Sequence, residues 1–387
     1  MSYLGIEIQL LEQANALWTA KEICQQPACW RQTAELVAKQ RQALDAFLAP
    51  LLRQADLHII LTGAGTSAFS GDVLLPFFNQ FTSLKAQAIP TTDLVSNPYQ
   101  YLKKHRPTLL VSFARSGNSP ESASAVKLVN QIVDQGYHLI FSCNQEGKLY
   151  RENYATENVC ALILPPQTND KGFAMTSSFS SMTLAAALVF FQPHFCCDVV
   201  EKLSYITQDF IEKKHQQIKA LASNDVDRVV YLGSGGFKGL SQESALKLLE
   251  LTAGEVVAIY DTPLGFRHGP KSIINAQTAV FVYLSNDFYT RQYDIDLCNE
   301  LLRDGKVSNL VILTAQLDHR LPAERQICLE GLSDLSDLAL VFPYITFAQM
   351  FAFYRSYLMG HTTDNPCPTG EVNRVVKGVI IHSYPLS

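Results

Sequence analysis

The sequence lacks several features that would place it in a specialised class of protein. Its nine cysteines contain no C-x-x-C pair, which argues against a zinc ribbon or a disulfide framework in so long a chain. The formal net charge is -5, so neither nucleic acid nor an anionic membrane is an expected partner. The N-terminus MSYLGIEIQLLEQ has no basic segment before an apolar one, and the most apolar run, MTLAAALVFF (182–191), is too short to span a bilayer. These absences predict a protein of the reducing cytoplasm.

The composition is that of a globular protein with a large core. The chain has 387 residues, 47% of them hydrophobic and 17% charged, which predicts about two domains with elaborations. Apolar residues recur at helical spacing in the first part of the chain, so residues 1–53 are predicted to be a helical segment.

After this segment, a pattern of strand, glycine turn and helix occurs twice. The second occurrence follows the first at a constant offset of about 170 residues. The matching runs are LHIILTGAGTS (57–67) with VVYLGSGGFKG (229–239), TLLVSFARSGNS (108–119) with TAVFVYLSND (278–287), and HLIFSCN (138–144) with NLVILTAQ (309–316). Apolar strands that alternate with helices predict parallel sheets covered on both faces. We therefore predict an α/β fold of two tandem units with flavodoxin-like layering.

The predicted boundaries place the first unit at 54–205, the second at 206–345, and a C-terminal helix with a tail at 346–387. The run PYITFAQMFAFYRSYLMG (343–360) is expected to form the last helix. The prolines and glycine of DNPCPTGEVNRVVKGVIIH then predict an irregular tail.

Two loops of the first unit carry residues suited to binding a phosphate monoester. Ligands of parallel sheets bind at the carboxyl ends of the strands, where the N–H groups of helix starts attract anions. The candidate ligands in these loops are Gly65, Thr66, Ser67, Arg115, Ser116, Asn118 and Ser119. A Rossmann dinucleotide turn is disfavoured because Gly63-x-Gly65 has Ala68 where the third glycine would stand. A second alternative is that the serines only cap the next helix, and capping can coexist with phosphate binding.

The segment SQESALKLLE (241–250) places Glu243, Lys247 and Glu250 on one stripe of a helix. Such a stripe is often an ordinary set of surface ion pairs. Here leucines and small residues occupy most of the remaining circumference, which is typical of a buried helix. Charges on a buried helix must face a cavity, a partner or each other, since burial of an unpaired charge is costly.

His268 lies in GFRHGP, between a glycine and a proline. A lone histidine is more often structural than catalytic, but its near-neutral pKa suits proton transfer. Both interpretations remain open on this residue alone.

The motifs GAGTS, ARSGNS, ESALKLLE and RHGP, in this order on a duplicated scaffold, resemble those of the sugar isomerase (SIS) domain proteins. That family includes the isomerase half of glucosamine-6-phosphate synthase. The segments NDKGFAMTSSF, YDTPLGFRHGPKS and DNPCPTGEVNRVVKG are more similar to AgaS-type proteins of amino-sugar catabolism. These are described as galactosamine-6-phosphate deaminase/isomerases and, in older naming, as tagatose-6-phosphate ketose/aldose isomerases.

The resemblance implies a role for each motif. It makes Glu250 the catalytic carboxylate, with Lys247 and Glu243 beside it, and His268 the ring-opening histidine that reaches the neighbouring subunit of a homodimer or higher oligomer. The family's phosphate loop matches Ser116 and Ser119, with Thr66 and Ser67 from the first loop. A tail lysine of the synthase matches Lys377. The loop departs from the synthase pattern at 114 and 115, where alanine and arginine replace serine and glutamine.

The implied reaction takes D-galactosamine 6-phosphate and water to D-tagatose 6-phosphate and ammonia, and it requires neither a metal nor a redox cofactor. Ring opening suits a histidine, and a carboxylate can then carry a proton between C2 and C1. One alternative is an aldose/ketose isomerase that releases no ammonia. The other is a non-catalytic sugar-phosphate sensor, which would need no complete set of acid and base residues and would carry a DNA-binding module. The sequence leaves open whether the substrate has the galacto or the gluco configuration.

Overall fold

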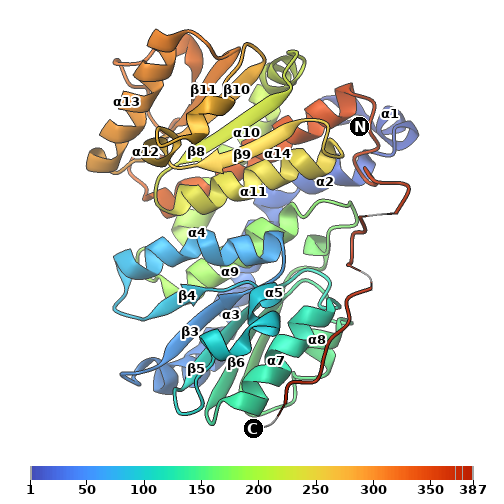
Figure 1. The fold of residues 1–387 in the computed structure, drawn as a ribbon, viewed down its shortest axis with the longest axis vertical. Helices are drawn as coiled ribbons and strands as arrows, with labels where there is room; N and C mark the ends of the chain where they lie inside the picture. Colours follow the sequence, from blue (N-terminus) through green and yellow to red (C-terminus); the bar gives the residue numbers. More distant parts are fainter. Residues whose placement is uncertain (1, 371, 377, 386–387) are drawn as a thin grey trace. The chain divides into compact units, whose positions relative to one another are not determined.

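The chain forms two compact units, each built around one five-stranded parallel sheet (Figure 1). This computed structural model describes residues 2–370, 372–376 and 378–385. The first-sheet unit consists of residues 28–170 and 177–197 with the tail from 369 onward, and the second-sheet unit consists of residues up to 27, 171–176 and 198–368. The α/β class and the parallel sheets flanked by helices are as predicted.

The first sheet has the strand order β4-β3-β5-β6-β7, and all of its neighbouring strands are parallel. Its central strands β3 and β5 are buried along their whole length, as their continuous apolar sequences predict. The strands are β3 (His58–Thr62), β4 (Ala86–Ala88), β5 (Thr108–Ala114), β6 (Gly136–Ser142) and β7 (Val159–Ile163). The helical elements are α3 (Gln26–Leu52), α4 (Thr66–Phe81), α5 (Thr91–Ser96), α6 (Pro98–Tyr101), α7 (Pro120–Ile132), α8 (Lys148–Arg151), η1 (Pro166–Thr168) and α9 (Ser177–Phe190).

Helices cover both faces of the first sheet. Ile60 of β3 and Leu110 of β5 belong to one apolar cluster with residues of α5 and α7. Leu61, the next residue of β3, points to the opposite face, where its Cβ lies close to Gly71 of α4. The alternation of side chains along each strand thus builds two apolar layers from one sheet.

The second sheet has the equivalent strand order, β9-β8-β10-β11-β12, and is also parallel throughout. Its strands are β8 (Arg228–Gly233), β9 (Val257–Asp261), β10 (Thr278–Tyr283), β11 (Asn309–Thr314) and β12 (Gln326–Cys328). The helical elements of this unit are α1 (Ile8–Gln13), α2 (Leu17–Cys24), α10 (Cys197–Ala222), α11 (Gly236–Leu251), α12 (Pro263–Phe266), η2 (Pro270–Ile273), α13 (Phe288–Asp304), η3 (Ala323–Arg325) and α14 (Asp337–Leu358).

The two sheets confirm the predicted duplication. Their first strands begin at His58 and Arg228 and their third strands at Thr108 and Thr278, so the second unit repeats the first at a constant offset. In each sheet the order is 2-1-3-4-5, which is the flavodoxin-like order. Ligands of this fold bind at the carboxyl edge, where the order reverses between the first and third strands. The loops after β3 and β5, and those after β8 and β10, are therefore the positions for a site.

Different helices cover the two faces of the second sheet. Phe237 of α11 and Tyr344 of α14 pack on Tyr283, and Ser244 of α11 hydrogen bonds to the Tyr283 hydroxyl at 2.7 Å. Val282, on the opposite face, packs in a cluster with Phe266 of α12 and with residues of α13. Figure 1 shows α11 running along β8 and β9. Helix α11 and the segment that follows β9 are therefore on opposite sides of this sheet.

Several predicted boundaries differ from the structure. The N-terminal segment is mostly helical but begins with a short antiparallel pair, β1 (Ser2–Tyr3) and β2 (Ile6–Glu7). The last helix begins at Asp337 rather than at Pro343, which lies inside it. The compact units are also not continuous in sequence, as the predicted boundaries at 53, 205 and 345 would require, because the N-terminal helices are divided between them.

Helix α14 has the length and apolar composition of a membrane span, but 94% of its most apolar window is buried inside the protein. The same test is passed by the core helix of a soluble protein, and α14 packs on α11. We therefore assign α14 to the core of the second-sheet unit.

Candidate active site

The loop after β3 owes its glycines to backbone geometry. Gly65 has φ 55° and ψ -130°, a conformation open essentially to glycine alone. A Cβ at Gly63 would lie 2.5 Å from the carbonyl carbon of Ser67. The Thr91 backbone N–H and hydroxyl both donate to the Gly63 carbonyl, at 2.7 and 3.0 Å. This tight turn starts α4 at Thr66, so Thr66 and Ser67 are held in the first turn of a helix at the carboxyl edge.

Hydrogen bonds to a neighbouring segment fix the loop after β5. Asn144 donates its side-chain N–H to the Ser116 carbonyl at 2.8 Å, and the Asn118 carboxamide oxygen accepts from the Lys148 backbone N–H at 3.1 Å. Ser119 is the N-cap residue of α7, but its hydroxyl pairs with that of Ser122 at 2.6 Å and makes no capping bond. The alternative that Ser119 only caps this helix is therefore not what the structure shows.

Arg115 contacts the C-terminal tail rather than an open anion site. Its side chain is only 6% exposed, and Nη2 donates to the Arg374 carbonyl at 2.7 Å. Arg374 in turn donates from Nε to the Asp170 carbonyl at 3.0 Å, and the buried Asp170 carboxylate accepts from the Ser178 backbone N–H at 2.8 Å. Arg115 thus couples the candidate phosphate loop to the tail. Lys377, the other basic candidate, lies outside the described residues.

The loop after β8 repeats the first turn. Gly235 has φ 57° and ψ -126°, close to the values at Gly65, and precedes α11 as Gly65 precedes α4. Glycine in both turns is therefore required by the fold and does not by itself indicate a ligand. The two turns differ in the residues that begin the next helix, which are Thr66 and Ser67 in the first-sheet unit and Gly236 and Phe237 in the second.

Helix α11 carries the predicted charged stripe into the interior. Glu243 is completely buried and Lys247 is 1% exposed, whereas the Glu250 side chain is 24% exposed. The Lys247 Nζ lies 2.5 Å from Glu250 Oε2 and 3.5 Å from Glu243 Oε1. The surface ion-pair interpretation is wrong, since only Glu250 reaches solvent. A buried ammonium between two carboxylates fixes the position of the Glu250 side chain.

His268 lies on the other side of the second sheet from Glu250. It follows α12, whose Phe266 packs on the face covered by α13, while Glu250 lies near the end of α11 on the opposite face. The imidazole is exposed, and within the described residues it makes no hydrogen bond or ion pair. The structure therefore separates Glu250 from the His268 of the same chain.

The second-sheet loops at the carboxyl edge are filled by carboxylates from their own unit. The Ser234 hydroxyl donates to Asp294 at 2.7 Å, and the Ser285 backbone N–H donates to the other oxygen of Asp294 at 3.1 Å. Asp337 accepts from the Ser285 hydroxyl at 2.5 Å and from the Asn286 backbone N–H at 2.7 Å. Burial raises the pKa of Asp294 to about 6 and also raises that of Asp337. The Ser234 hydroxyl and the backbone N–H groups of Ser285 and Asn286 thus donate to carboxylates of their own unit.

Comparisons with known proteins agree with this architecture. The SIS domain family model matches residues 51–191, which lie mainly in the first-sheet unit. The D-galactosamine-6-phosphate deaminase AgaS of Shewanella sp. strain ANA-3 is 45% identical over 388 residues, covering 99% of this chain and 96% of the relative. AgaS of Escherichia coli is 45% identical over 380 residues, covering 96% and 97%. This chain belongs to the AgaS family of SIS-domain proteins.

Comparison with a solved structure shows that the similarity to the family extends to the fold. The tagatose-6-phosphate ketose/aldose isomerase of Escherichia coli superposes with a TM-score of 0.90 at 42% identity, covering 95% of this chain and 97% of that one. The likeness includes both units, although the SIS family model matches only one of them. The second-sheet unit of this AgaS-family chain is recognised as a repeat by its strand order.

Sequence reasoning missed two residues of the AgaS-family site region, Asp170 and Arg374. Both occur in the segments NDKGFAMTSSF and DNPCPTGEVNRVVKG, which carried the family resemblance. Those two segments could have pointed to Asp170 and Arg374. The two residues are 204 positions apart, however, so no local pattern predicts their contact.

Proposed function

We propose that this chain is a galactosamine-6-phosphate deaminase/isomerase that converts D-galactosamine 6-phosphate and water to D-tagatose 6-phosphate and ammonia. The observation that carries the proposal is the Glu243-Lys247-Glu250 stripe, in which two almost fully buried residues hold one partly exposed carboxylate. Burying the charges of Glu243 and Lys247 is costly, so their presence in the interior favours a functional role. The near-full-length similarity to AgaS relatives supports the choice of substrate.

The phosphate is proposed to bind at the carboxyl edge of the first sheet. Thr66 and Ser67 lie in the first turn of α4, and Ser116, Asn118 and Ser119 lie between β5 and α7. The starts of these two helices add backbone N–H groups and positive dipole ends, which together favour a dianion. Arg115 contributes indirectly, by holding the tail beside this loop.

Ring opening is assigned to His268 acting in the site of a neighbouring subunit. A proton must move between the ring oxygen and O1, which suits an imidazole. Phe266, two residues before His268, and Phe237 of the helix that carries Glu250 pack on opposite faces of the second sheet, which favours a His268 supplied by another subunit. Exposed apolar side chains follow three strand ends of the same unit, namely Leu264, Phe288 and Leu317. Such a surface is suited to a homodimer or a higher homo-oligomer.

Glu250 is assigned the proton transfer from C2 to C1. It removes the C2 proton of the open aldehyde, which forms an enolamine with the amino group on C2, and it returns the proton to C1. The product is an imine at C2 with a hydroxymethyl group at C1. Water then adds to the imine carbon and ammonia leaves, which yields the ketose. Lys247 holds the Glu250 carboxylate in place, and Glu243 balances the charge of Lys247.

A second candidate is aldose/ketose isomerisation of tagatose 6-phosphate without release of ammonia. It is favoured by the name of the similar Escherichia coli structure. Both reactions share ring opening and the proton shift, and they differ only in whether C2 carries an amino group or a hydroxyl. The sensor alternative is less favoured because the acid and base residues are all present. We also place the enzyme in the reducing cytoplasm, which suits the nine free cysteines.

The deciding experiment is an assay of the purified protein for ammonia and for ketose phosphate. Galactosamine, glucosamine and tagatose 6-phosphates are compared at equal concentration. We expect ammonia and tagatose 6-phosphate from the galacto amino sugar. Exchange of tagatose and galactose phosphates without ammonia would instead establish the isomerase alternative, and no reaction with any of the three would favour a sensor.

A further inference from the structure

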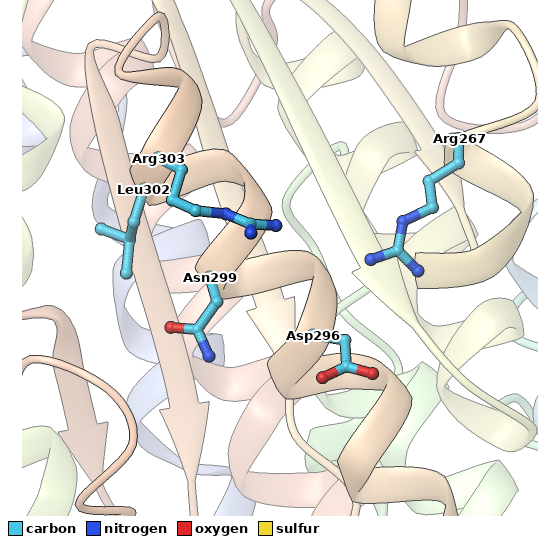
Figure 2. Close-up of a pocket in the computed structure, with 5 residues that line it drawn as sticks. All are labelled: Arg267, Asp296, Asn299, Leu302 and Arg303. Atoms are coloured by element: carbon cyan, nitrogen blue, oxygen red, sulfur yellow. The ribbon is translucent and has the colours of Figure 1, made fainter.

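A second ligand cavity lies on the surface of the second-sheet unit, outside the residues assigned to the reaction. It has a volume of about 740 Å³ and lies between α13 and the turn that follows α12. Its lining residues are Arg267, Asp296, Asn299, Leu302 and Arg303 (Figure 2). The four lining residues from α13 recur at helical spacing, so they form one face of that helix. The volume is within the range of small-molecule sites.

Arg267 and Arg303 present guanidinium donors to this cavity. Arg267 uses Nε for an ion pair with Glu300 at 2.8 Å, and within the described residues its Nη atoms make no hydrogen bond. Glu300 is also bound by Lys271, and this hydrogen bond lowers the pKa of the Glu300 carboxyl. The Arg303 side chain has no hydrogen bond or ion pair in the part of the chain that the structure describes. Figure 2 shows both guanidinium groups directed into the space between them.

The other polar groups of the cavity indicate which groups the ligand carries besides a phosphate. Asp296 and Asn299 lie about one turn apart on α13, and both line the cavity. Guanidinium forks match phosphate oxygens, while a carboxylate and a carboxamide suit hydroxyl or amino groups. The Asp296 carboxylate in the lining disfavours a second phosphate on the ligand. The expected ligand is therefore a monophosphate that carries hydroxyl groups.

We infer that this cavity is a regulatory site for a hexose or hexosamine monophosphate. Arg267 immediately precedes His268, and both belong to the short turn between α12 and Gly269. A phosphate bound between Arg267 and Arg303 would compete with Glu300 for Arg267 and so shift the backbone at His268. The regulatory effect rests on the proposed function, because it acts through His268, whereas the binding itself does not.

The test uses D-sorbitol 6-phosphate, which has no carbonyl or amine and cannot be turned over. It is titrated calorimetrically into the full-length Ser116→Ala/Ser119→Ala protein, in which the first-sheet phosphate loop is weakened. We expect one binding event per chain. Adding Arg303→Ala should raise its Kd by about 10- to 100-fold, the loss typical of a charge-assisted pair. Arg303→Lys should have a smaller effect, since charge remains but the fork is lost.

Arg151→Ala is the matched control, an exposed arginine of the first-sheet unit, and should leave the Kd unchanged. Equal affinity with and without Arg303, or no binding in the double variant, overturns the site. In the otherwise wild-type enzyme at saturating galactosamine 6-phosphate, the hexitol phosphate should change kcat, and Arg303→Ala should abolish that change. A kcat that does not respond overturns the regulatory role. If the wild-type protein releases no ammonia, the proposed function fails, and the titrations still decide the site.

Discussion

The two sheets have the same topology, but the loops at their carboxyl edges differ in their hydrogen-bond partners. In the first-sheet unit, the loops after β3 and β5 end in hydroxyls at the starts of α4 and α7. In the second-sheet unit, the equivalent loops donate to the carboxylates of Asp294 and Asp337. A duplicated fold therefore supplies two potential anion sites, and the second has been closed by its own carboxylates.

This difference divides the proposed reaction between the units. The open loops of the first sheet are available to a phosphate, and the second sheet, relieved of that role, carries the acid and base residues on α11 and after α12. Loss of a residue from the first sheet should therefore weaken substrate binding, while loss of one from the second should slow the chemistry or destabilise the protein. Variants in equivalent positions can test this division.

The largest effect is expected for Glu250→Gln. The substitution keeps the shape of the side chain but removes the proton carrier, so kcat should fall by about 10²- to 10⁴-fold, with little change in KM. Steady-state ammonia release measures both constants, and circular dichroism checks the fold. A variant that retains most of its kcat would remove Glu250 from the reaction.

Lys247→Met should destabilise the second-sheet unit strongly. It leaves the fully buried Glu243 without the cation 3.5 Å away, and breaking a buried pair costs about 3–5 kcal/mol. Urea unfolding measures the loss in free energy. The double variant Glu243→Leu/Lys247→Met removes both charges and should recover much of it. If the double variant is no more stable than Lys247→Met, the charge imbalance is not the cause.

The topology and the charged stripe of α11 could be predicted from the sequence because their signals are local. Buried strands such as β5 are continuous apolar runs, and Glu243, Lys247 and Glu250 lie within one helix at fixed spacing. The edge strands β4, β7, β9 and β12 give no comparable signal, because they are short or partly exposed.

Contacts between distant segments could not be predicted in the same way. Arg115 meets Arg374, 259 positions later, and Ser285 meets Asp337, 52 positions later. Neither contact leaves a periodic pattern in the sequence. The hydrogen bonds between the second-sheet loops and distant carboxylates are contacts of this kind. The sequence alone therefore predicts two similar sets of loops and does not show how they differ.

The carboxylate that closes the second-sheet loop should make stability depend on pH. Burial raises the pKa of Asp294 to about 6 from its usual 3.8, so the folded state favours the protonated form. The stabilisation is full below pH 3.8 and is lost as the pH rises through about 6, and it amounts to roughly 3 kcal/mol.

Asp294→Asn removes this titration, and comparison with the wild-type protein isolates it. The free energy of unfolding of the wild-type protein relative to the variant should fall between about pH 4 and pH 7, as measured by urea unfolding across that range. Parallel pH profiles for the two proteins would show that Asp294 does not titrate in this window.

The smallest effect is expected in the first-sheet loop, where Ser116→Ala/Ser119→Ala removes two hydroxyls from the proposed phosphate site. KM for galactosamine 6-phosphate should rise by about 10- to 100-fold with little change in kcat, since two hydrogen bonds to a charged phosphate are lost while the helix N-termini remain. Ser285→Ala is the matched control, because Ser285 lies in the equivalent loop after β10 and its hydroxyl donates to Asp337. It should leave KM unchanged. An equal rise in KM for both variants would mean that the second-sheet loop also meets the substrate, and the division of roles between the two sheets would then be wrong.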